Sequence, residues 1–292
     1  MSEYSYTPRA KGTSARQQAE WHERYASAPG LDTAQAHILA VVEAVAAAGE
    51  WSNDAYNRLV RRLAREGHPI LPKAQIRRGY RALVERGVVE EDPVVLRRLR
   101  MKPTRTLSGV APVTVLTRPF PCPGQCIFCP DDARMPKSYL SNEPGAMRAL
   151  MLEFDPYVQT RERIEAMRRT GHTVDKIELL ILGGTWSAYP RSYQVWFLRR
   201  CFDALNGLQT GRADGYAGLH PEAEEWALLA AAQRANEGAA HRNVGLVVET
   251  RPDRVTGAEV RRLRGPGAAR RRLRVRSLGD PGGPAQQPAP TP

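Results

Sequence analysis

The chain has 292 residues, of which 42% are hydrophobic, 43 are Lys or Arg, 31 are Asp or Glu and four are Cys. Four cysteines are too few for a disulfide-stabilised scaffold, and the apolar content is too high for a wholly disordered chain. No apolar run approaches the roughly 20 residues of a membrane helix, and the polar N-terminus is unlike a signal peptide. We therefore expect a cytoplasmic protein of about two domains, with reduced thiols and no membrane partner.

The net charge of +12 indicates a polyanionic partner, and its basic residues are clustered. The stretch from Arg58 to Arg81 holds eight basic residues and a single acid, Glu66. We expect three helices in this region, over 31–49, 54–66 and 73–86, within a basic domain spanning 1–98 that has the character of a small nucleic-acid-binding bundle. An ordinary solvated helical face is the alternative. The candidate nucleic-acid contacts are Arg58, Arg61, Arg62, Arg65, Lys73, Arg77, Arg78 and Arg81.

From about Met101 the pattern changes to strands that alternate with helices. Expected strands cover 110–116, 177–182 and 244–249, and expected helices cover 155–170, 189–205, 222–236 and 256–264. Such alternation predicts an α/β fold with a parallel sheet. Functional groups are then expected at the carboxyl ends of the strands.

Three of the four cysteines, Cys122, Cys126 and Cys129, form a C-x3-C-x2-C loop just after the first expected strand. Zinc sites prefer paired C-x2-C units and four ligands, although a zinc-binding structural module remains the alternative. Three thiolates on a [4Fe-4S] cluster leave one iron open for a substrate or cofactor. The fourth cysteine, Cys201, lies on an apolar helix face, and we expect it to be a buried structural thiol.

The cysteine spacing resembles the signature of radical SAM enzymes, with the aromatic Phe128 just before the third cysteine. The turn Gly183-Gly184-Thr185 after the second strand resembles the glycine motif with which that superfamily binds SAM. At the end of the third strand, Glu249 and Arg251 could hold ribose hydroxyls and a carboxylate. A local ion pair is the alternative for these two residues.

Further segments narrow the resemblance. They are Lys102–Val110, Lys137–Pro144, Phe154–Gln159 and Gly171–Lys176, which flank the cysteine loop and the Gly-Gly-Thr turn. Together they resemble the elongator protein 3 family, the radical SAM and acetyltransferase-like enzymes that modify the wobble uridine of tRNA. The resemblance covers about 102–264, more than half of the chain.

The resemblance implies a tRNA uridine(34) carboxymethyltransferase that works on acetyl-CoA through a 5′-deoxyadenosyl radical and yields 5-carboxymethyluridine. In that reading Lys176 contacts acetyl-CoA, while His172 is expected to have a surface role. Both a homodimer and partner subunits are compatible with the sequence. The residues implied for SAM are Phe128, Gly183, Gly184, Thr185, Glu249 and Arg251, beside the cluster ligands Cys122, Cys126 and Cys129.

The end of the chain departs from the family pattern, which implies about six barrel strands and an acetyltransferase-like domain. Residues 265–292 contain six Pro, five Gly and five Arg, and we expect them to be disordered. The expectation is therefore a partial (β/α) radical SAM barrel over 99–264, from a truncated or frameshifted gene product without turnover. A non-catalytic tRNA-binding remnant is the alternative.

Overall fold

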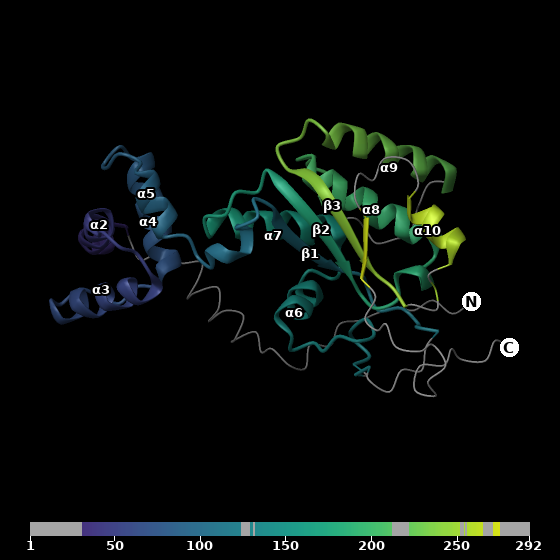
Figure 1. Cartoon of the computed structure of the whole chain (residues 1–292), viewed down its shortest axis with the longest axis horizontal. Helices are drawn as coiled ribbons and strands as arrows, with labels where there is room; N and C mark the ends of the chain where they lie inside the picture. The colour runs from purple at the N-terminus through teal and green to yellow at the C-terminus, as the bar shows by residue number, and fades with distance from the viewer. Residues whose placement is uncertain are drawn as a thin grey trace. The chain divides into compact units, whose positions relative to one another are not determined.

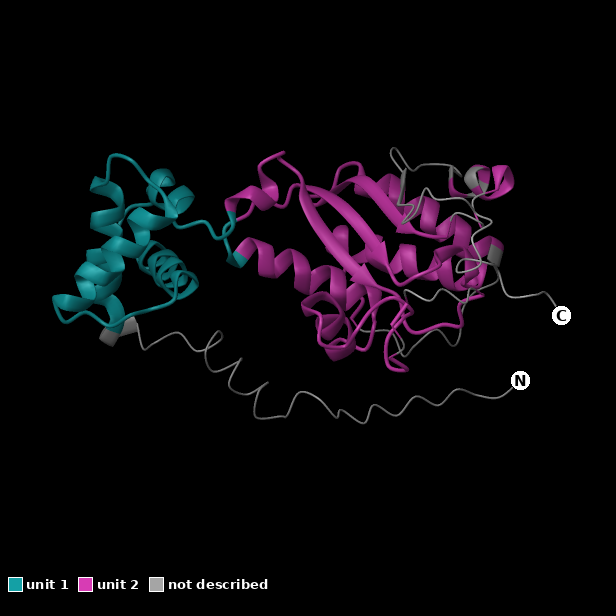
Figure 2. Cartoon of the chain, turned by 60° about the horizontal axis from the view of Figure 1, so that its bottom comes forward, with its two compact units in different colours: residues 1–102, 169–171 teal, residues 103–168, 172–292 magenta. Residues whose placement is uncertain are grey.

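The structure, a computed structural model, describes residues 31–123, 129–130, 132–211, 222–251, 254, 256–264 and 271–274. The chain divides into two compact units, shown in Figure 2. Unit 1 comprises 1–102 with 169–171, and unit 2 comprises 103–168 with 172–292. The boundary falls at Lys102, whereas the sequence suggested residue 98. Among the described helices, none is both long enough and apolar enough to cross a bilayer.

Unit 1 contains four described helices: α2 (Leu31–Ala47), α3 (Asn53–Arg65), α4 (Lys73–Glu85) and α5 (Pro93–Arg98). The expectation of three helices was wrong because α5 is short. Its start nevertheless carries a sequence signal, since Asp92 Oδ1 accepts a hydrogen bond from Val94 N at 2.7 Å and Pro93 opens the helix.

The apolar core of unit 1 joins all four helices. Gly79 allows α4 to approach α2 closely, because a Cβ at this position would overlap Ile38 Cδ1. Arg98 at the end of α5 donates to the carbonyl oxygens of Val45 and Ala48 at 2.7 and 2.6 Å, which satisfies the C-terminal end of α2. The buried core residues include Ile38, Val41, Val45, Leu63, Ile76, Tyr80, Leu83, Val95 and Leu99.

Unit 2 is built on a parallel sheet of β1 (Ala111–Leu116), β2 (Lys176–Leu182), β3 (Arg242–Glu249) and β4 (Arg271–Arg274), in that order. The α/β fold with a parallel sheet is therefore as expected, and Figure 1 shows the arrows of β1, β2 and β3 pointing the same way. Strand β4 corrects the expectation of disorder for its four residues. Its backbone pairs with the edge that β3 would otherwise leave open, which needs no apolar side chains.

The helices of unit 2 are α6 (Pro144–Met151), α7 (Pro156–Arg169), α8 (Arg191–Leu205), α9 (Glu222–Asn236) and α10 (Gly257–Arg264). Single turns of 3₁₀ helix, η1 (Pro103–Thr106) and η2 (Trp186–Ala188), precede β1 and α8. Among these five α-helices only α6 was not predicted, because its opening Pro144-Gly145 is a dipeptide typical of turns.

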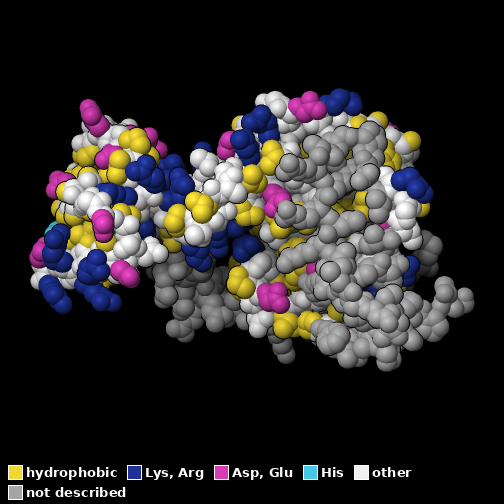
Figure 3. Space-filling view, viewed as in Figure 1, with side chains coloured by type: hydrophobic (Ala, Val, Ile, Leu, Met, Phe, Trp, Pro, Cys, Tyr) yellow, Lys and Arg dark blue, Asp and Glu magenta, His cyan; other side chains and the backbone are white. Residues whose placement is uncertain are grey.

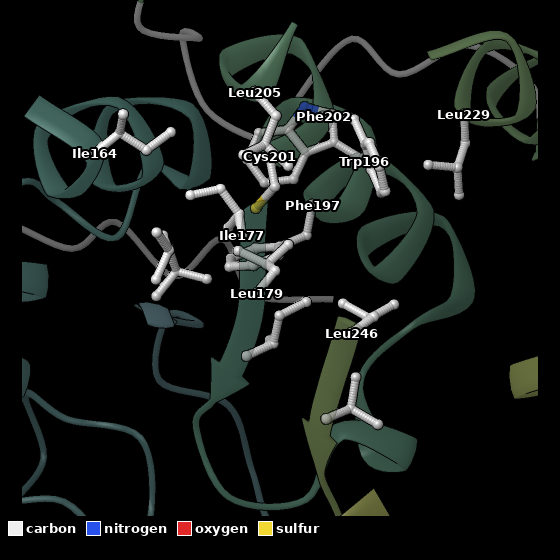
Figure 4. Packing of buried hydrophobic residues seen from close by; sticks show 14 of the residues in the cluster. Ile164, Ile177, Leu179, Trp196, Phe197, Cys201, Phe202, Leu205, Leu229 and Leu246 are labelled. Atoms are coloured by element: carbon white, nitrogen blue, oxygen red, sulfur yellow. The ribbon is translucent and has the colours of Figure 1, made fainter. Parts of the chain in front are cut away.

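The main core of unit 2 lies between alternate residues of the strands and the helices α7, α8 and α9. From the strands come Val113, Leu179 and Leu246, and from α8 come Phe197 and Cys201. Figure 4 shows the Cys201 sulfur pointing from α8 toward β2. The prediction of a buried thiol is confirmed, since Cys201 is 0% exposed and burial raises its pKa to about 12.

A smaller cluster covers the opposite face of the sheet at its carboxyl edge. Leu116 at the end of β1 is buried there with Tyr139, Ala146 and Phe154, and Leu182 packs against them. This cluster fixes α6 and the segment that precedes it against the strand ends.

The outer edge of β1 is completed by a side chain. Leu116 N donates to Gln159 Oε1 at 2.9 Å, and Gln159 Nε2 donates to Leu116 O at 2.9 Å. Gln159, on α7, thus pairs with the edge of β1 at the strand's last residue, where no described strand lies beside it. It is 5% exposed, so water does not offer an alternative partner.

We expect Gln159→Leu to reduce the free energy of unfolding of unit 2 by about 2 kcal/mol or more, because it leaves two buried backbone groups without hydrogen bonds. Denaturant unfolding followed by tryptophan fluorescence measures the change. Arg161→Leu, at an exposed position on the same helix, is the matched control and should change stability by less than about 0.5 kcal/mol. Equal stability of the two variants would contradict the role assigned to Gln159.

Candidate functional site at the carboxyl edge of the sheet

Two of the three clustered cysteines lie among the described residues, and each thiol is next to a hydroxyl group. Cys122 Sγ is 3.3 Å from Thr185 Oγ1, which belongs to the turn after β2. Cys129 Sγ is 3.1 Å from Ser138 Oγ. The sheet therefore brings the cysteine loop and the Gly-Gly-Thr turn together, as the parallel topology predicts.

The approach to Cys122 is positioned by aromatic residues that precede and begin α8. The Tyr189 hydroxyl lies 2.7 Å from Thr117 Oγ1 and donates to Arg118 O at 2.8 Å, while the Tyr193 hydroxyl accepts from Arg118 N at 3.2 Å. Phe120 stacks on the Tyr189 ring with centroids 4.9 Å apart. Burial raises the pKa of both tyrosines, which keeps both hydroxyls protonated.

The turn after β2 requires glycine at two successive positions. Gly183 has φ +142° and Gly184 has φ +90°, values that side chains rarely adopt. A Cβ at Gly183 would overlap Thr117 Oγ1, and a Cβ at Gly184 would lie 3.1 Å from the Lys137 carbonyl oxygen. The turn is therefore pressed between the end of β1 and the segment that follows the cysteines.

The loop after Cys129 is closed by a charged side-chain pair. Asp132 accepts hydrogen bonds from Arg134 Nε and Nη2, both at 3.1 Å, and from Ser141 N at 3.2 Å. The Arg134 bonds hold the pKa of the Asp132 carboxyl well below its usual range. The loop is consequently tied at both ends of the segment that carries Ser138.

Glu249, the last residue of β3, is 3% exposed and accepts a hydrogen bond on Oε2 from the Tyr139 hydroxyl at 2.6 Å. The next residue, Thr250, donates to Ser187 Oγ at 2.9 Å, and Ser187 donates to Glu259 Oε1 at 2.7 Å. A buried carboxylate at the end of β3 is thus oriented by the same segment that contacts Cys129. In the sequence, Lys137–Pro144 was recognised only as part of the family resemblance, and no local pattern indicated a site role for Ser138 or Tyr139.

The donor set at this edge fits an iron–sulfur cluster. Cys122 and Cys129 are free, partly exposed thiols, the soft ligands that such clusters require. Cys126 and Phe128 lie outside the described residues, as do 252–253 of the stretch after Arg251. No group of three metal-ligating side chains is found within the described part of the chain, which holds two of the three cysteines.

Comparisons with known proteins find several relatives of this chain. The chain is 45% identical over 195 residues to the tRNA uridine(34) acetyltransferase of Methanocaldococcus infernus, covering 65% of this chain and 34% of that protein. It is 34% identical to the Elongator complex protein 3 of Drosophila melanogaster, covering 63% of this chain and 33% of that protein. The chain is a homologue of the elongator protein 3 family. The resemblance found in the sequence is confirmed.

The chain spans about one third of the length of the curated elongator protein 3 relatives that it matches. A solved structure of an N-terminally deleted Elp3 from Methanocaldococcus infernus is 36% identical to it, with a TM-score of 0.38, covering 56% of this chain and 28% of that one. No protein-family model matches the sequence.

Two further residues were singled out in the sequence of this elongator protein 3 homologue. Lys176 is exposed at the first residue of β2, roughly 20 Å along the strand from the edge that carries the cysteines, so the structure does not bring it to them. His172 was expected at the surface, but it is 4% exposed and its Nδ1 lies 2.9 Å from Thr106 Oγ1. A histidine after a helix-ending glycine packs inward here because the η1 turn covers it.

The expected basic surface divides between two helices. The four arginines of α3 are exposed, and Figure 3 shows Lys and Arg side chains gathered over this helix. The expectation that Arg77 of α4 lies on the surface was wrong. Arg77 is 3% exposed and donates to Leu96 O at 2.6 Å, and burial together with Arg81 and Arg100 lowers its pKa to about 10. Lys73 is half-buried, with Nζ 4.8 Å from the Tyr56 ring centroid.

We expect Gly183→Ala to destabilise unit 2 by about 2 kcal/mol or more and to displace Thr185 from Cys122, because the new Cβ would overlap Thr117. Thermal unfolding measures the first effect, and thiol reactivity of Cys122 measures the second. Gly238→Ala is the control, since a Cβ at that exposed position meets nothing within 4 Å. Unchanged stability and reactivity in Gly183→Ala would refute the packing of this turn.

Proposed function

We propose that unit 2 is part of the radical SAM domain of an enzyme that modifies uridine 34 of tRNA, with 5-carboxymethyluridine as product and acetyl-CoA as co-substrate. The observation that carries this proposal is the carboxyl edge of the sheet. There the C-x3-C-x2-C loop after β1 meets the Gly-Gly-Thr turn after β2, in a chain homologous to proteins named tRNA uridine(34) acetyltransferase. The parallel strands with intervening helices then correspond to part of a (β/α) barrel.

In this proposal Cys122, Cys126 and Cys129 hold a [4Fe-4S] cluster with one iron open to SAM. When bound, the cluster supplies the electron for reductive cleavage of SAM. Cys201 takes no part, because its raised pKa keeps it a neutral thiol inside the core, whereas cluster ligands are thiolates.

In this proposal, the residues at the carboxyl edge of the sheet bind SAM and hold it in position. The Gly183-Gly184 turn exposes backbone to a bound ligand, because neither residue carries a side chain. Glu249 presents a carboxylate that Tyr139 holds in one orientation, which suits recognition of ribose hydroxyls. Arg251, Phe128 and Thr185 complete the proposed SAM-binding set. Lys176 lies at the opposite edge of the sheet, so a contact between Lys176 and acetyl-CoA would be distant from the cysteines.

Unit 1 is proposed to bind the phosphate backbone of tRNA. Arg58, Arg61, Arg62 and Arg65 are exposed along α3, and phosphate binding depends on clustered, accessible cations. Arg78 and Arg81 of α4 are half-buried and belong to the proposed surface with less accessible charge. Arg77 is better explained as a structural residue of unit 1.

Anaerobic reconstitution with iron and sulfide tests the cluster. We expect about four irons per chain and visible absorption, followed by release of 5′-deoxyadenosine from SAM under reducing conditions. Alanine at Cys122, Cys126 or Cys129 should abolish the absorption, whereas Cys201→Ala should keep it. Stoichiometric zinc without visible absorption would favour the zinc-binding module instead.

The tRNA contact is tested by replacing all four α3 arginines with alanine in the full chain. We expect at least about tenfold weaker tRNA binding by fluorescence anisotropy, and a slope of log K against log salt reduced by roughly three. The control replaces four exposed arginines of unit 2, Arg161, Arg168, Arg234 and Arg242. Equal losses in both variants would show a non-specific charge effect, and tRNA binding without any cluster would favour the non-catalytic alternative.

A further inference from the structure

The segment Lys137–Ser138–Tyr139 contacts three separate parts of the candidate site. The Lys137 carbonyl faces Gly184, and the Tyr139 hydroxyl donates to Glu249 at 2.6 Å. Tyr139 N also donates to Pro136 O at 3.2 Å, which closes a turn around Ser138. Both neighbours of Ser138 are therefore fixed against the ends of β2 and β3.

Ser138 itself has a backbone conformation that disfavours side chains. Its φ is +80°, in the left-handed region, where a residue other than glycine costs about 1–2 kcal/mol. Serine in place of glycine at such a position indicates that the hydroxyl has a use, since strain of this kind persists at functional sites. The hydroxyl lies 3.1 Å from Cys129 Sγ.

When Cys129 is a ligand of the cluster, the hydrogen bond between Ser138 and Cys129 can run in only one direction. A thiolate can only accept, so the Ser138 hydroxyl donates. Thr185 Oγ1 stands in the same relation to Cys122 Sγ, at 3.3 Å. Hydrogen bonds to the sulfur ligands of an iron–sulfur cluster stabilise its reduced, more negative state and so raise its reduction potential.

We propose that Ser138 is a positioning residue whose hydroxyl donates a hydrogen bond to the Cys129 thiolate and raises the reduction potential of the cluster. This inference rests on the proposed function, because only a cluster held by Cys129 has such a potential. The arrangement couples cluster reduction to the strand ends, since Ser138 is held by Gly184 on one side and by Glu249 on the other.

The test compares reconstituted wild type with Ser138→Ala, Ser138→Gly and the control Ser108→Ala, an exposed serine before β1. Iron per chain is measured first, and then the midpoint potential by redox titration followed by electron paramagnetic resonance. We expect both Ser138 variants to keep their iron and to shift to a more negative potential. Ser108→Ala should match wild type in both.

The two Ser138 variants distinguish the effect of the hydroxyl group from the effect of the backbone strain. Glycine removes the hydroxyl and also relieves the strain at φ +80°, whereas alanine removes only the hydroxyl. A wild-type potential in Ser138→Gly, or loss of the cluster from both variants, would overturn the inference while the proposed function stands. Absence of a cluster from wild type would instead overturn the proposed function.

Discussion

The parallel pairing of β1, β2 and β3 is the constraint on which the candidate site depends. Because the three strands run the same way, the residues that follow Leu116, Leu182 and Glu249 emerge at one edge of the sheet. Segments far apart in the chain thereby meet at the edge where the strand–helix alternation of the sequence predicts functional groups. The pairing fixes where the strands end, but the cysteine loop and the glycine turn still need side chains to hold them there.

Those side chains come from the connections rather than from the strands. Tyr189 and Tyr193 fix the path from β1 to Cys122, and Gln159 occupies the open edge of β1 at the same level. On the other side, Tyr139 joins the post-cysteine loop to Glu249. Each of these contacts satisfies a buried polar group that the sheet alone would leave unpaired, so rigidity at the site and stability of the fold have the same origin.

Hydrophobic periodicity and the residues that end helices and strands predicted most elements, because strands and long helices carry local sequence patterns. The three expected strands, the helices around them and the burial of Cys201 all follow from such patterns. The short helices α5 and α6 were missed, because each spans only six or eight residues and opens with a proline. Ser138, Arg77 and His172 could not be placed, because their surroundings are made by segments distant in sequence. The Asp92-Pro93 pair before α5 was the one local signal left unused.

A count of basic residues overstates how many side chains of unit 1 are available to bind RNA, because several of them are engaged inside the unit. Arg98 donates to the carbonyls that end α2, Arg77 donates to Leu96 O, and Lys73 lies over the Tyr56 ring. Removing such a cation from its partner in order to contact RNA would leave buried carbonyls unpaired. Lys73, Arg77 and Arg98 therefore stabilise the bundle first. In the described structure the exposed arginines of α3 are not bonded to buried carbonyl groups. The phosphate binding proposed for unit 1 therefore depends chiefly on that helix.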